Sequence, residues 1–366
     1  MNLSIRAAGS FAWEAELMDT ALTVCNLRAY YLTRYFGIER EVRAVDDISL
    51  AVKKKEIYGI AGESSCGKST FIRTIAAAVR PPLRVLGGSI KYSFLDRDLY
   101  HLDDRALADI RWKRLSCILQ GSMNVLNPVR RVRESFKDFA FPHMGLARPA
   151  FLDVVKQHLE RLHLSPSVLS AFPHELSGGM RQRVAIALAT VCRPEFIIAD
   201  EPTTALDVVV QKDVLALIRE TQREIGSSMI FVTHDLAVHA NISNRLGIMY
   251  AGRLVEEGPT GVVLHNPMHP YTRHLVASLP QIGDLTPKKP LSGAPPNLAD
   301  PPSGCRFHPR CPLAMEICRR AHPALTPLDS GRRVACYAVS PLVKPAVDSA
   351  AAPNRTQADK YAVFPR

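Results

Sequence analysis

The stretch Gly62-Glu63-Ser64-Ser65-Cys66-Gly67-Lys68-Ser69-Thr70 fits the pattern G-x-x-x-x-G-K-[ST] at every required position. Residues 56–61 before it carry no charge after Glu56 and predict a buried strand, and residues 71–79 after it predict a helix that ends before Pro81-Pro82. This order of strand, loop and helix is the context in which the pattern binds phosphate. The stretch therefore predicts an α/β fold built around a phosphate-binding loop.

The chemistry of the loop follows from its residue types. Gly62 and Gly67 allow the chain to curl without Cβ clashes, so that backbone N–H groups face an anion at the positive end of the helix. Lys68 is expected to reach the β- and γ-phosphates of a nucleotide, and the Ser69 hydroxyl to bind Mg²⁺. The residues expected to line bound ATP are Gly62, Ser64, Ser65, Cys66, Gly67, Lys68, Ser69 and Thr70.

Three apolar runs further along the chain each lead into polar side chains. The run at 115–119 precedes Gln120, the run at 196–199 precedes Asp200 and Glu201, and the run at 229–233 precedes His234. Because parallel strands present their ligands at their carboxyl ends, these side chains are expected to gather beside the loop. Side chains alternate along a strand, so Asp200 is expected in the Mg²⁺ shell and Glu201 at the attacking water. Gln120 is well placed to touch the same Mg²⁺ or a water molecule.

A second anion site is predicted at Leu176-Ser177-Gly178-Gly179-Met180. Ser177 is a natural N-cap for a helix that continues to about Val191, and Gly178 and Gly179 expose backbone N–H groups at its positive end. The simpler alternative is a capped helix with a flexible entry.

Length and composition limit the other possibilities. At 366 residues the chain is expected to hold one large domain plus an appendage, and no segment approaches the apolar length of a membrane span. The start has no signal-peptide pattern, which predicts a cytosolic chain. A formal charge of +11 would suit nucleic acid or an anionic surface, but the basic residues are spread along the sequence.

In their order along the chain, these motifs resemble the ATPase subunit of an ABC transporter over about residues 21–280. The resemblance implies a P-loop NTPase (RecA-like) core with an antiparallel β subdomain and an α-helical insertion at about 121–176. The expected divisions are an N-terminal extension at 1–20, the ATPase domain at 21–265, a small irregular extension at 266–340 and a flexible tail at 341–366.

The resemblance also implies roles for single residues. Glu201 would be the general base and His234 the contact to the γ-phosphate, while Gln120 would sense both Mg²⁺ and a membrane subunit. Asp207 would link two ATPase chains across a dimer. Ser177 and Gly179, with Gly178 between them, would contact ATP held by the partner's phosphate loop, so that two chains sandwich two nucleotides head to tail.

An aromatic side chain would stack on the adenine. Tyr31 lies at the corresponding position and Tyr30 is its rival, although either side chain would equally serve as ordinary packing. Lys55 and Ser65 stand where relatives usually or often have glycine. Gly121-Ser122 follow Gln120 where relatives commonly carry Asp-Pro, a departure that bears on the contact with the membrane subunits.

Several segments narrow the resemblance to the oligopeptide/dipeptide permease branch. They are Asn127-Pro128, Met180, Met268–Arg273, Gly293–Pro296 and Gly304–Pro312. This branch imports solutes, which implies a second homologous ATPase subunit, two transmembrane permease subunits, an extracytoplasmic solute-binding protein and a peripheral position on the cytoplasmic face of the membrane. No nucleic-acid partner is expected. The alternative is a soluble nucleic-acid-associated ABC ATPase.

Half of the eight cysteines lie in the Pro-rich extension, at Cys305, Cys311, Cys318 and Cys336. Four thiolates suit zinc or an iron–sulfur cluster. Because similar cysteines in this branch are taken to hold a [4Fe-4S] cluster, the cluster ranks first, with zinc and free thiols as alternatives. Cys66 is a separate case: beside Lys68 at a helix N-terminus it is expected either to favour the thiolate or merely to fill a variable position.

Overall fold

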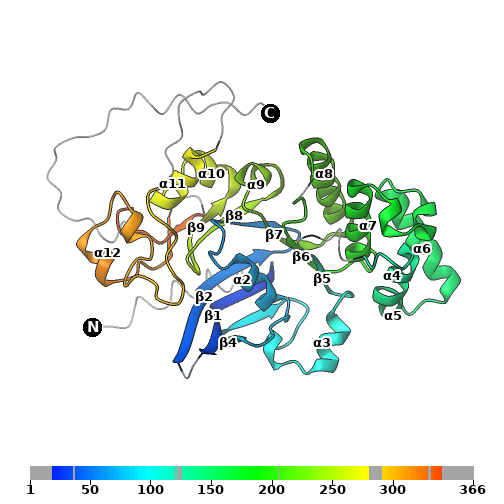
Figure 1. Cartoon of the computed structure of the whole chain (residues 1–366), viewed down its shortest axis with the longest axis horizontal. Coiled ribbons are helices and arrows are strands. Elements are labelled where there is room, and N and C mark those ends of the chain that lie inside the picture. Colours follow the sequence, from blue (N-terminus) through cyan, green and yellow to red (C-terminus); the bar gives the residue numbers. More distant parts are fainter. Residues whose placement is uncertain are drawn as a thin grey trace.

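The computed structural model of the chain describes residues 19–339, apart from 36–37, 120, 122–125, 205, 280–290 and 329–330. The N-terminal extension up to residue 18 and the tail at 341–366 lie outside the described residues. Within the described part, two sheets, a helical lobe and a C-terminal extension form one body (Figure 1).

The larger sheet positions the predicted site. Its strand order is β10-β11-β9-β8-β3-β7-β6-β5, and β5, β6, β7, β3 and β8 run parallel. The central strands are buried along their whole length, which explains why they appear in the sequence as unbroken apolar runs. The bounds are Ile57–Ala61 (β3), Leu115–Ile118 (β5), Phe196–Asp200 (β6), Ser228–Val232 (β7), Arg245–Tyr250 (β8), Arg253–Pro259 (β9), Thr326–Pro327 (β10) and Arg333–Val334 (β11).

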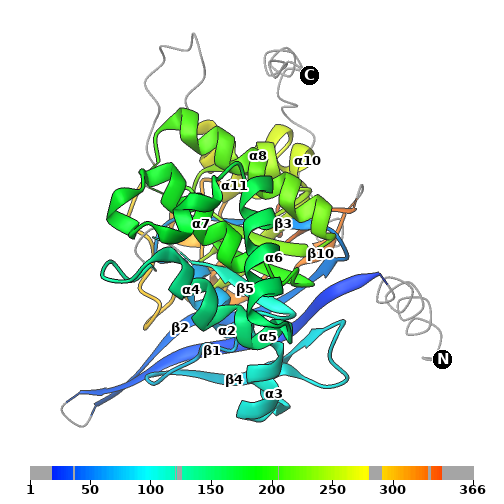
Figure 2. The same ribbon diagram turned by 90° about the vertical axis from the view of Figure 1, so that its right-hand side faces the viewer.

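The smaller sheet is antiparallel, with β1 (Thr20–Tyr35) between β2 (Ile38–Lys53) and β4 (Leu83–Tyr92). The sequence predicts strands at 21–27, at 42–52 and from Gly87, and all three lie within strands of this sheet. The first prediction was too short, because β1 continues through both tyrosines and pairs Tyr31 with Val42 after a register shift. Figure 2 shows this sheet beneath the main sheet, and α2 (Lys68–Ile75) packs between the two.

Helix α2 ends four residues earlier than expected. Its last carbonyl groups accept hydrogen bonds from side chains, from the Tyr92 hydroxyl to Ile75 O at 2.8 Å and from the Tyr100 hydroxyl to Thr74 O at 2.8 Å. Ala77 then adopts a positive φ of 50°. The backbone groups that would continue the helix are satisfied in another way.

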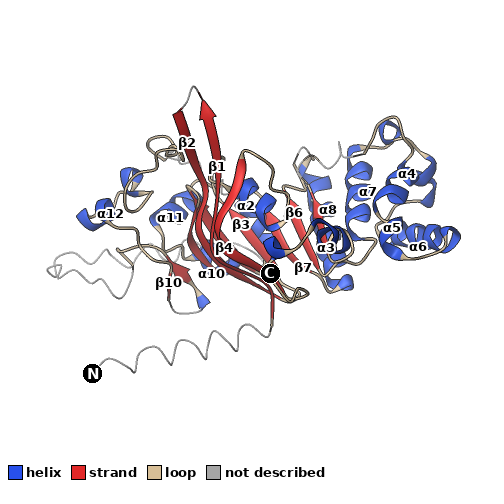
Figure 3. Ribbon diagram, turned by 90° about the horizontal axis from the view of Figure 1, so that it is seen from below, coloured by secondary structure: helices blue, strands red, loops and turns tan. Residues whose placement is uncertain are grey.

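The remaining helices lie on both faces and at both ends of the sheet. The helical lobe formed by α4, α5 and α6 lies beyond β5, and α12 lies at the opposite end, beyond β9 (Figures 1 and 3). The bounds are Asp104–Ile110 (α3), Val132–Phe139 (α4), Phe141–Met144 (α5), Arg148–Arg161 (α6), Gly178–Thr190 (α7), Val208–Ile225 (α8), Leu236–Ile242 (α9), Thr260–His265 (α10), Pro270–Ala277 (α11) and Glu316–Arg320 (α12). Among the described residues, none of these helices has the length and apolar character needed to cross a membrane.

The C-terminal extension is more regular than the sequence suggests. Strand β11 pairs with β9 and so lengthens the main sheet. Phe307 is buried in an apolar cluster with Tyr250 and Tyr271, where their rings lie about 5 Å apart. The extension therefore shares a core with the ATPase domain.

Candidate nucleotide site

The phosphate loop joins β3 to α2 and its two glycines are required by close backbone contacts. Gly62 has φ 156° and Gly67 has φ 107°. A Cβ atom on Gly67 would lie 1.9 Å from the carbonyl oxygen of Ala44, and one on Gly62 would lie 2.1 Å from that of Met249. No other residue fits either position without moving the neighbouring strand.

Lys68 lies over this loop. Its Nζ atom donates to the carbonyl oxygens of Gly62 at 2.6 Å and Glu63 at 2.9 Å, and the residue is only 8% exposed. Ser64, Ser65 and Ser69 are exposed, whereas Cys66 and Thr70 are buried. The predicted nucleotide-lining residues thus divide into an outer set, open to an incoming anion, and an inner set that supports the loop.

The two tyrosine candidates have different environments. Tyr30 is buried and its hydroxyl donates to Asp46 Oδ1 at 2.5 Å, so its ring is part of the core and does not serve as a base-stacking surface. Tyr31 is half-buried, and its hydroxyl lies 3.2 Å from Thr70 Oγ1 in α2. Of the two, only Tyr31 borders the phosphate loop.

Of the two alternatives for Cys66, the structure disfavours the thiolate. Cys66 is 4% exposed, and burial raises the pKa of its thiol even though Lys68 Nζ lies 3.7 Å from the sulfur. Desolvation outweighs the nearby ammonium group.

Asp200 and Glu201 lie at the carboxyl end of β6. Burial and the adjacent Glu201 raise the pKa of Asp200, an effect that the positive charge of Lys68 partly offsets. Glu201 has φ 45°, and its N–H donates to Val232 O at 2.8 Å, which fixes it to the neighbouring strand β7. The separate roles of the two carboxylates stay a prediction.

The Glu201 carboxylate is held on both oxygens. Oε1 lies 3.0 Å from His234 Nδ1, and Oε2 accepts a hydrogen bond from Thr204 Oγ1 at 3.0 Å. Burial alone would raise the pKa of Glu201, but the hydrogen bonds from His234 and Thr204 outweigh it and lower the pKa. Glu201 is therefore ionised at neutral pH, as a proton acceptor must be.

The sequence did not identify Thr204. It lies in the run Pro202-Thr203-Thr204, three residues after Glu201. This spacing allows a turn to bring the Thr204 hydroxyl back to the carboxylate, and it was the only signal in the sequence. Gln120 lies outside the described residues.

Ser177 and Asp207 cap helices. Ser177 Oγ accepts from Met180 N at 3.3 Å at the start of α7, with Gly178 and Gly179 in the first turn, and Asp207 Oδ1 accepts from Val210 N at 2.9 Å at the start of α8. Both side chains are exposed. Helix α7 packs against α8 and β5, whereas α2 packs against β1, β2 and β6. The second anion site and the phosphate loop thus belong to separately packed parts of the chain.

The four cysteines of the extension lie within electrostatic range of one another. Burial, together with the nearby Cys318, Cys336 and Cys311, raises the pKa of Cys305 to about 11. Burial also raises the pKa of Cys311 and Cys336. Within the part of the chain that the structure describes, however, no group of three or more His, Cys, Asp or Glu is arranged to hold a metal ion. The described geometry therefore shows no metal site at these cysteines, and the [4Fe-4S] cluster and zinc stay predictions.

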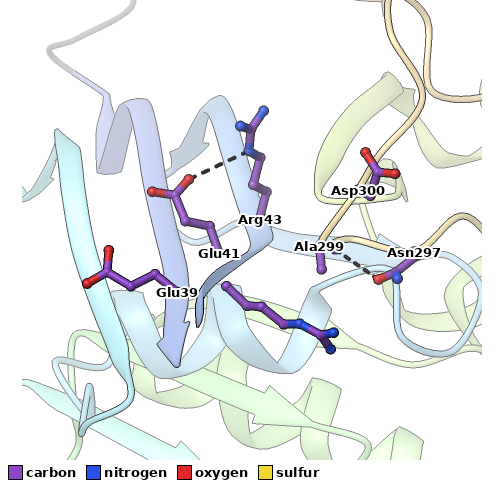
Figure 4. A pocket seen from close by; sticks show the side chains of 7 residues that line it. Glu39, Glu41, Arg43, Asn297, Ala299 and Asp300 are labelled. Carbon is purple, nitrogen blue, oxygen red and sulfur yellow. Dashed lines mark hydrogen bonds and ion pairs between the residues drawn. The ribbon is translucent and has the colours of Figure 1, made fainter. Parts of the chain in front are cut away.

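A separate hollow of about 450 Å³ lies between β2 and residues 297–300 of the extension (Figure 4). Its lining residues are Glu39, Arg40, Glu41, Arg43, Asn297, Ala299 and Asp300. The backbone N–H of Arg43 donates to Leu298 O at 2.9 Å, so the hollow lies where β2 contacts the extension. It contains none of the predicted nucleotide residues.

Comparisons with known proteins agree with this geometry. The family described as ABC transporter matches residues 45–204, and the family described as oligopeptide/dipeptide transporter, C-terminal region, matches residues 255–318. The dipeptide transport ATP-binding protein DppD of Caldanaerobacter subterraneus subsp. tengcongensis is 40% identical over 87% of this chain and 97% of its own length. The oligopeptide transport ATP-binding protein OppD of Salmonella typhimurium is 38% identical over 87% of this chain and 94% of its own.

Solved structures show the same fold. The dimeric structure of MJ0796, a bacterial ABC transporter cassette, superposes with a TM-score of 0.55 at 26% identity, and covers 65% of this chain and 98% of that one. A post-hydrolysis state of the same cassette bound to ADP and Pi gives a TM-score of 0.56 with the same coverage. The expected P-loop NTPase fold is confirmed.

Proposed function

The chain belongs to the oligopeptide and dipeptide transport branch of the ABC transporter ATPases, and from that premise we propose that it hydrolyses ATP to energise the import of peptides or related solutes. The observation that carries the proposal is the Glu201 carboxylate, held by His234 and Thr204 at the carboxyl edge of the sheet that also bears the phosphate loop. The named relatives support the solute class, because they are dipeptide and oligopeptide transport proteins.

In the proposed reaction, the loop amides and Lys68 bind the β- and γ-phosphates, and Glu201 accepts a proton from the attacking water. His234 contacts the γ-phosphate. Its side chain is 62% exposed and therefore open to a ligand. The Ser69 hydroxyl and the Asp200 carboxylate are hard oxygen donors that suit Mg²⁺, and Gln120 completes the predicted set. When bound, Mg²⁺ supplies charge neutralisation at the phosphates.

We propose that the active form is a head-to-tail pair of ATPase subunits. The exposed caps at Ser177 and Asp207 support this arrangement, because α7 packs apart from α2 and its free N–H groups suit an anion supplied by another chain. Dimerisation of the cassette named above is consistent with it. Tyr31 would stack on the adenine.

The partners follow from the branch. The proposal includes a second homologous ATPase subunit, two transmembrane permease subunits and an extracytoplasmic solute-binding protein, with this chain peripheral on the cytoplasmic face of the membrane. The rival function, a soluble nucleic-acid-associated ABC ATPase, is not supported, because the matched C-terminal region at 255–318 is that of peptide transporters.

We also propose that the extension binds a thiophilic centre at Cys305, Cys311, Cys318 and Cys336, with [4Fe-4S] ahead of zinc. The mutual electrostatic influence of the four thiols supports the idea, and ligation would require their side chains to turn toward one another. Iron, sulfide and zinc analysis of protein purified without oxygen tests it. Protein free of all three would leave four thiols and refute the centre.

The test of the main proposal compares the wild type with Lys68→Ala in MgATP binding and hydrolysis. We expect the wild type to bind and hydrolyse ATP, and the variant to lose binding. Co-purification from native membranes should bring down permease subunits. Failure of the wild type to hydrolyse ATP, or its association with nucleic acid at physiological salt in place of permeases, would refute the proposal.

A further inference from the structure

The C-terminal extension contacts the phosphate loop at Glu63. The guanidinium group of Arg310 forms a two-pronged ion pair with its carboxylate, Nη1 to Oε2 at 2.9 Å and Nη2 to Oε1 at 3.2 Å. The backbone N–H of Glu63 donates to the Tyr271 hydroxyl at 2.8 Å. Both the side chain and the backbone of this loop residue are therefore held by segments that follow the ATPase core in the sequence.

This ion pair is shielded from water. The Arg310 side chain is 7% exposed and that of Glu63 is 23% exposed. The Arg310 guanidinium group also donates to the Tyr250 hydroxyl at 3.3 Å and to Ser292 O at 3.1 Å. These bonds fix the orientation of the group. A bidentate, partly buried pair of this kind is stronger than an ordinary surface ion pair.

The segment that carries Arg310 is anchored at its other end as well. Arg306 donates to Asp46 and to the carbonyl oxygen of Ala251, and the next residue, Gly252, donates its N–H to Cys66 O at 2.7 Å. The segment between Cys305 and Cys311 is thus held at Arg306 as well as at Arg310.

From this geometry we propose that Arg310 is a positioning residue for nucleotide binding, which acts by neutralising the Glu63 carboxylate on the phosphate loop. The loop must receive a triphosphate, and an unpaired carboxylate within it would repel that anion. Without Arg310 the Glu63 charge would remain on the loop in a site of low dielectric, where one charge at roughly 10 Å changes affinity by about tenfold. The proposal deepens the proposed function and rests on ATP binding at this loop.

The experiment is a double-mutant cycle on the full-length protein, with MgATP binding measured by calorimetry and hydrolysis measured in parallel. We expect Arg310→Ala to raise Kd and KM about tenfold with kcat within about twofold of the wild type, because the general base is untouched. Glu63→Ala alone should bind within about threefold of the wild type. The double variant should recover the affinity of Glu63→Ala, because removing the unpaired carboxylate removes the repulsion.

The matched control is Arg320→Ala, which breaks an exposed pair with Glu316 in the same extension and should leave Kd unchanged. Thermal unfolding of each variant measures folding separately. Wild-type protein that does not bind MgATP would refute the proposed function itself. Normal binding by Arg310→Ala, or a double variant as weak as Arg310→Ala, would overturn the positioning role alone and leave the ATPase function standing.

Discussion

The Nδ1 atom of His234 lies 3.0 Å from the Oε1 atom of Glu201, and this contact joins the ends of two neighbouring strands, β7 and β6. The Glu201 side chain is 16% exposed, whereas that of His234 is 62% exposed. The carboxylate is therefore sheltered and oriented while the imidazole remains open to a ligand. This arrangement suits a base that acts on water beside a phosphate.

Replacing the base tests this assignment directly. Glu201→Gln keeps the size and the hydrogen-bonding shape of the side chain but cannot accept a proton, so we expect kcat to fall by about 100-fold or more with ATP binding retained. The variant should accumulate an ATP-bound dimer, measurable by light scattering. Glu195→Gln is the matched control, because Glu195 lies at the other end of the same strand in an exposed pair with Arg114. Parental turnover by Glu201→Gln would contradict the role.

Thr204 offers a test that depends on pH. Its hydroxyl stabilises the ionised form of Glu201, so Thr204→Val should raise the pKa of Glu201. A higher pKa means that the base is protonated at higher pH, and the acid limb of the kcat/KM profile should move to higher pH. Thr204→Ser should restore the wild-type profile. An unchanged acid limb in the valine variant would show that this hydrogen bond does not lower the pKa of Glu201.

The neighbouring tyrosines should differ in what their loss affects. Tyr31→Ala should weaken MgATP binding about tenfold, since stacking on a base contributes about 1–3 kcal/mol, while Tyr31→Phe retains the ring and binds normally. Tyr30→Phe should leave Kd unchanged but lower stability by about 1–3 kcal/mol, because Asp46 loses a buried hydrogen-bond donor. Calorimetry and urea unfolding measure the two effects. The opposite pattern would reassign the base-stacking residue.

Much of the site is local in sequence, which is why it could be predicted. Asp200, Glu201 and His234 lie at the carboxyl ends of buried strands, and Lys68 follows β3 after the phosphate loop. Parallel pairing of those strands brings the strand ends to one edge. The choice between Tyr30 and Tyr31 needed coordinates, because one register shift in β1 decides which ring enters the core.

The contacts of the extension could not be predicted for a different reason. Arg310 and Glu63 are 247 residues apart, and any of the chain's many arginines has the charge to pair with Glu63. Cys66 illustrates the competing effect of burial: the sequence shows an adjacent ammonium and a helix N-terminus, but it does not show the apolar surroundings that raise the pKa of the thiol.

Lys55 allows a test of backbone strain. Its φ of 60° lies in the left-handed region, which explains why glycine suits this turn and why the lysine is an unusual choice. Lys55→Gly should stabilise the protein by about 0.5–1 kcal/mol, since relief of the Cβ clash exceeds the added flexibility of the unfolded chain. Lys54→Gly is the control next to it, exposed and without a positive φ, and should not stabilise. If urea unfolding gave both variants the same change in the free energy of unfolding, the backbone at Lys55 would not be strained.

Acid sensitivity is expected from buried histidines. Burial lowers the pKa of His158 to about 4, of His239 to about 4 and of His269 to about 3. These side chains stay neutral in the folded protein while the unfolded chain takes up protons below about pH 6.5, so their contribution to stability is complete above that pH and is lost as the pH falls toward 4. At pH 5 each such group should cost about 2 kcal/mol relative to pH 8.

His158 allows this loss to be measured separately. The Thr190 hydroxyl donates to Ile186 O at 2.7 Å, so the His158 Nε2 atom, 2.8 Å from Thr190 Oγ1, must be the donor in that contact. His158→Gln can keep a donor near the same oxygen without a titrating ring. We expect it to reduce the stability lost between pH 8 and pH 5 by about 2 kcal/mol, measured by urea unfolding at both values. His101→Gln, at an exposed position, should lose as much as the wild type. An equal loss in His158→Gln and the wild type would show that carboxylates alone, such as the ion-paired Asp46, account for the acid limit.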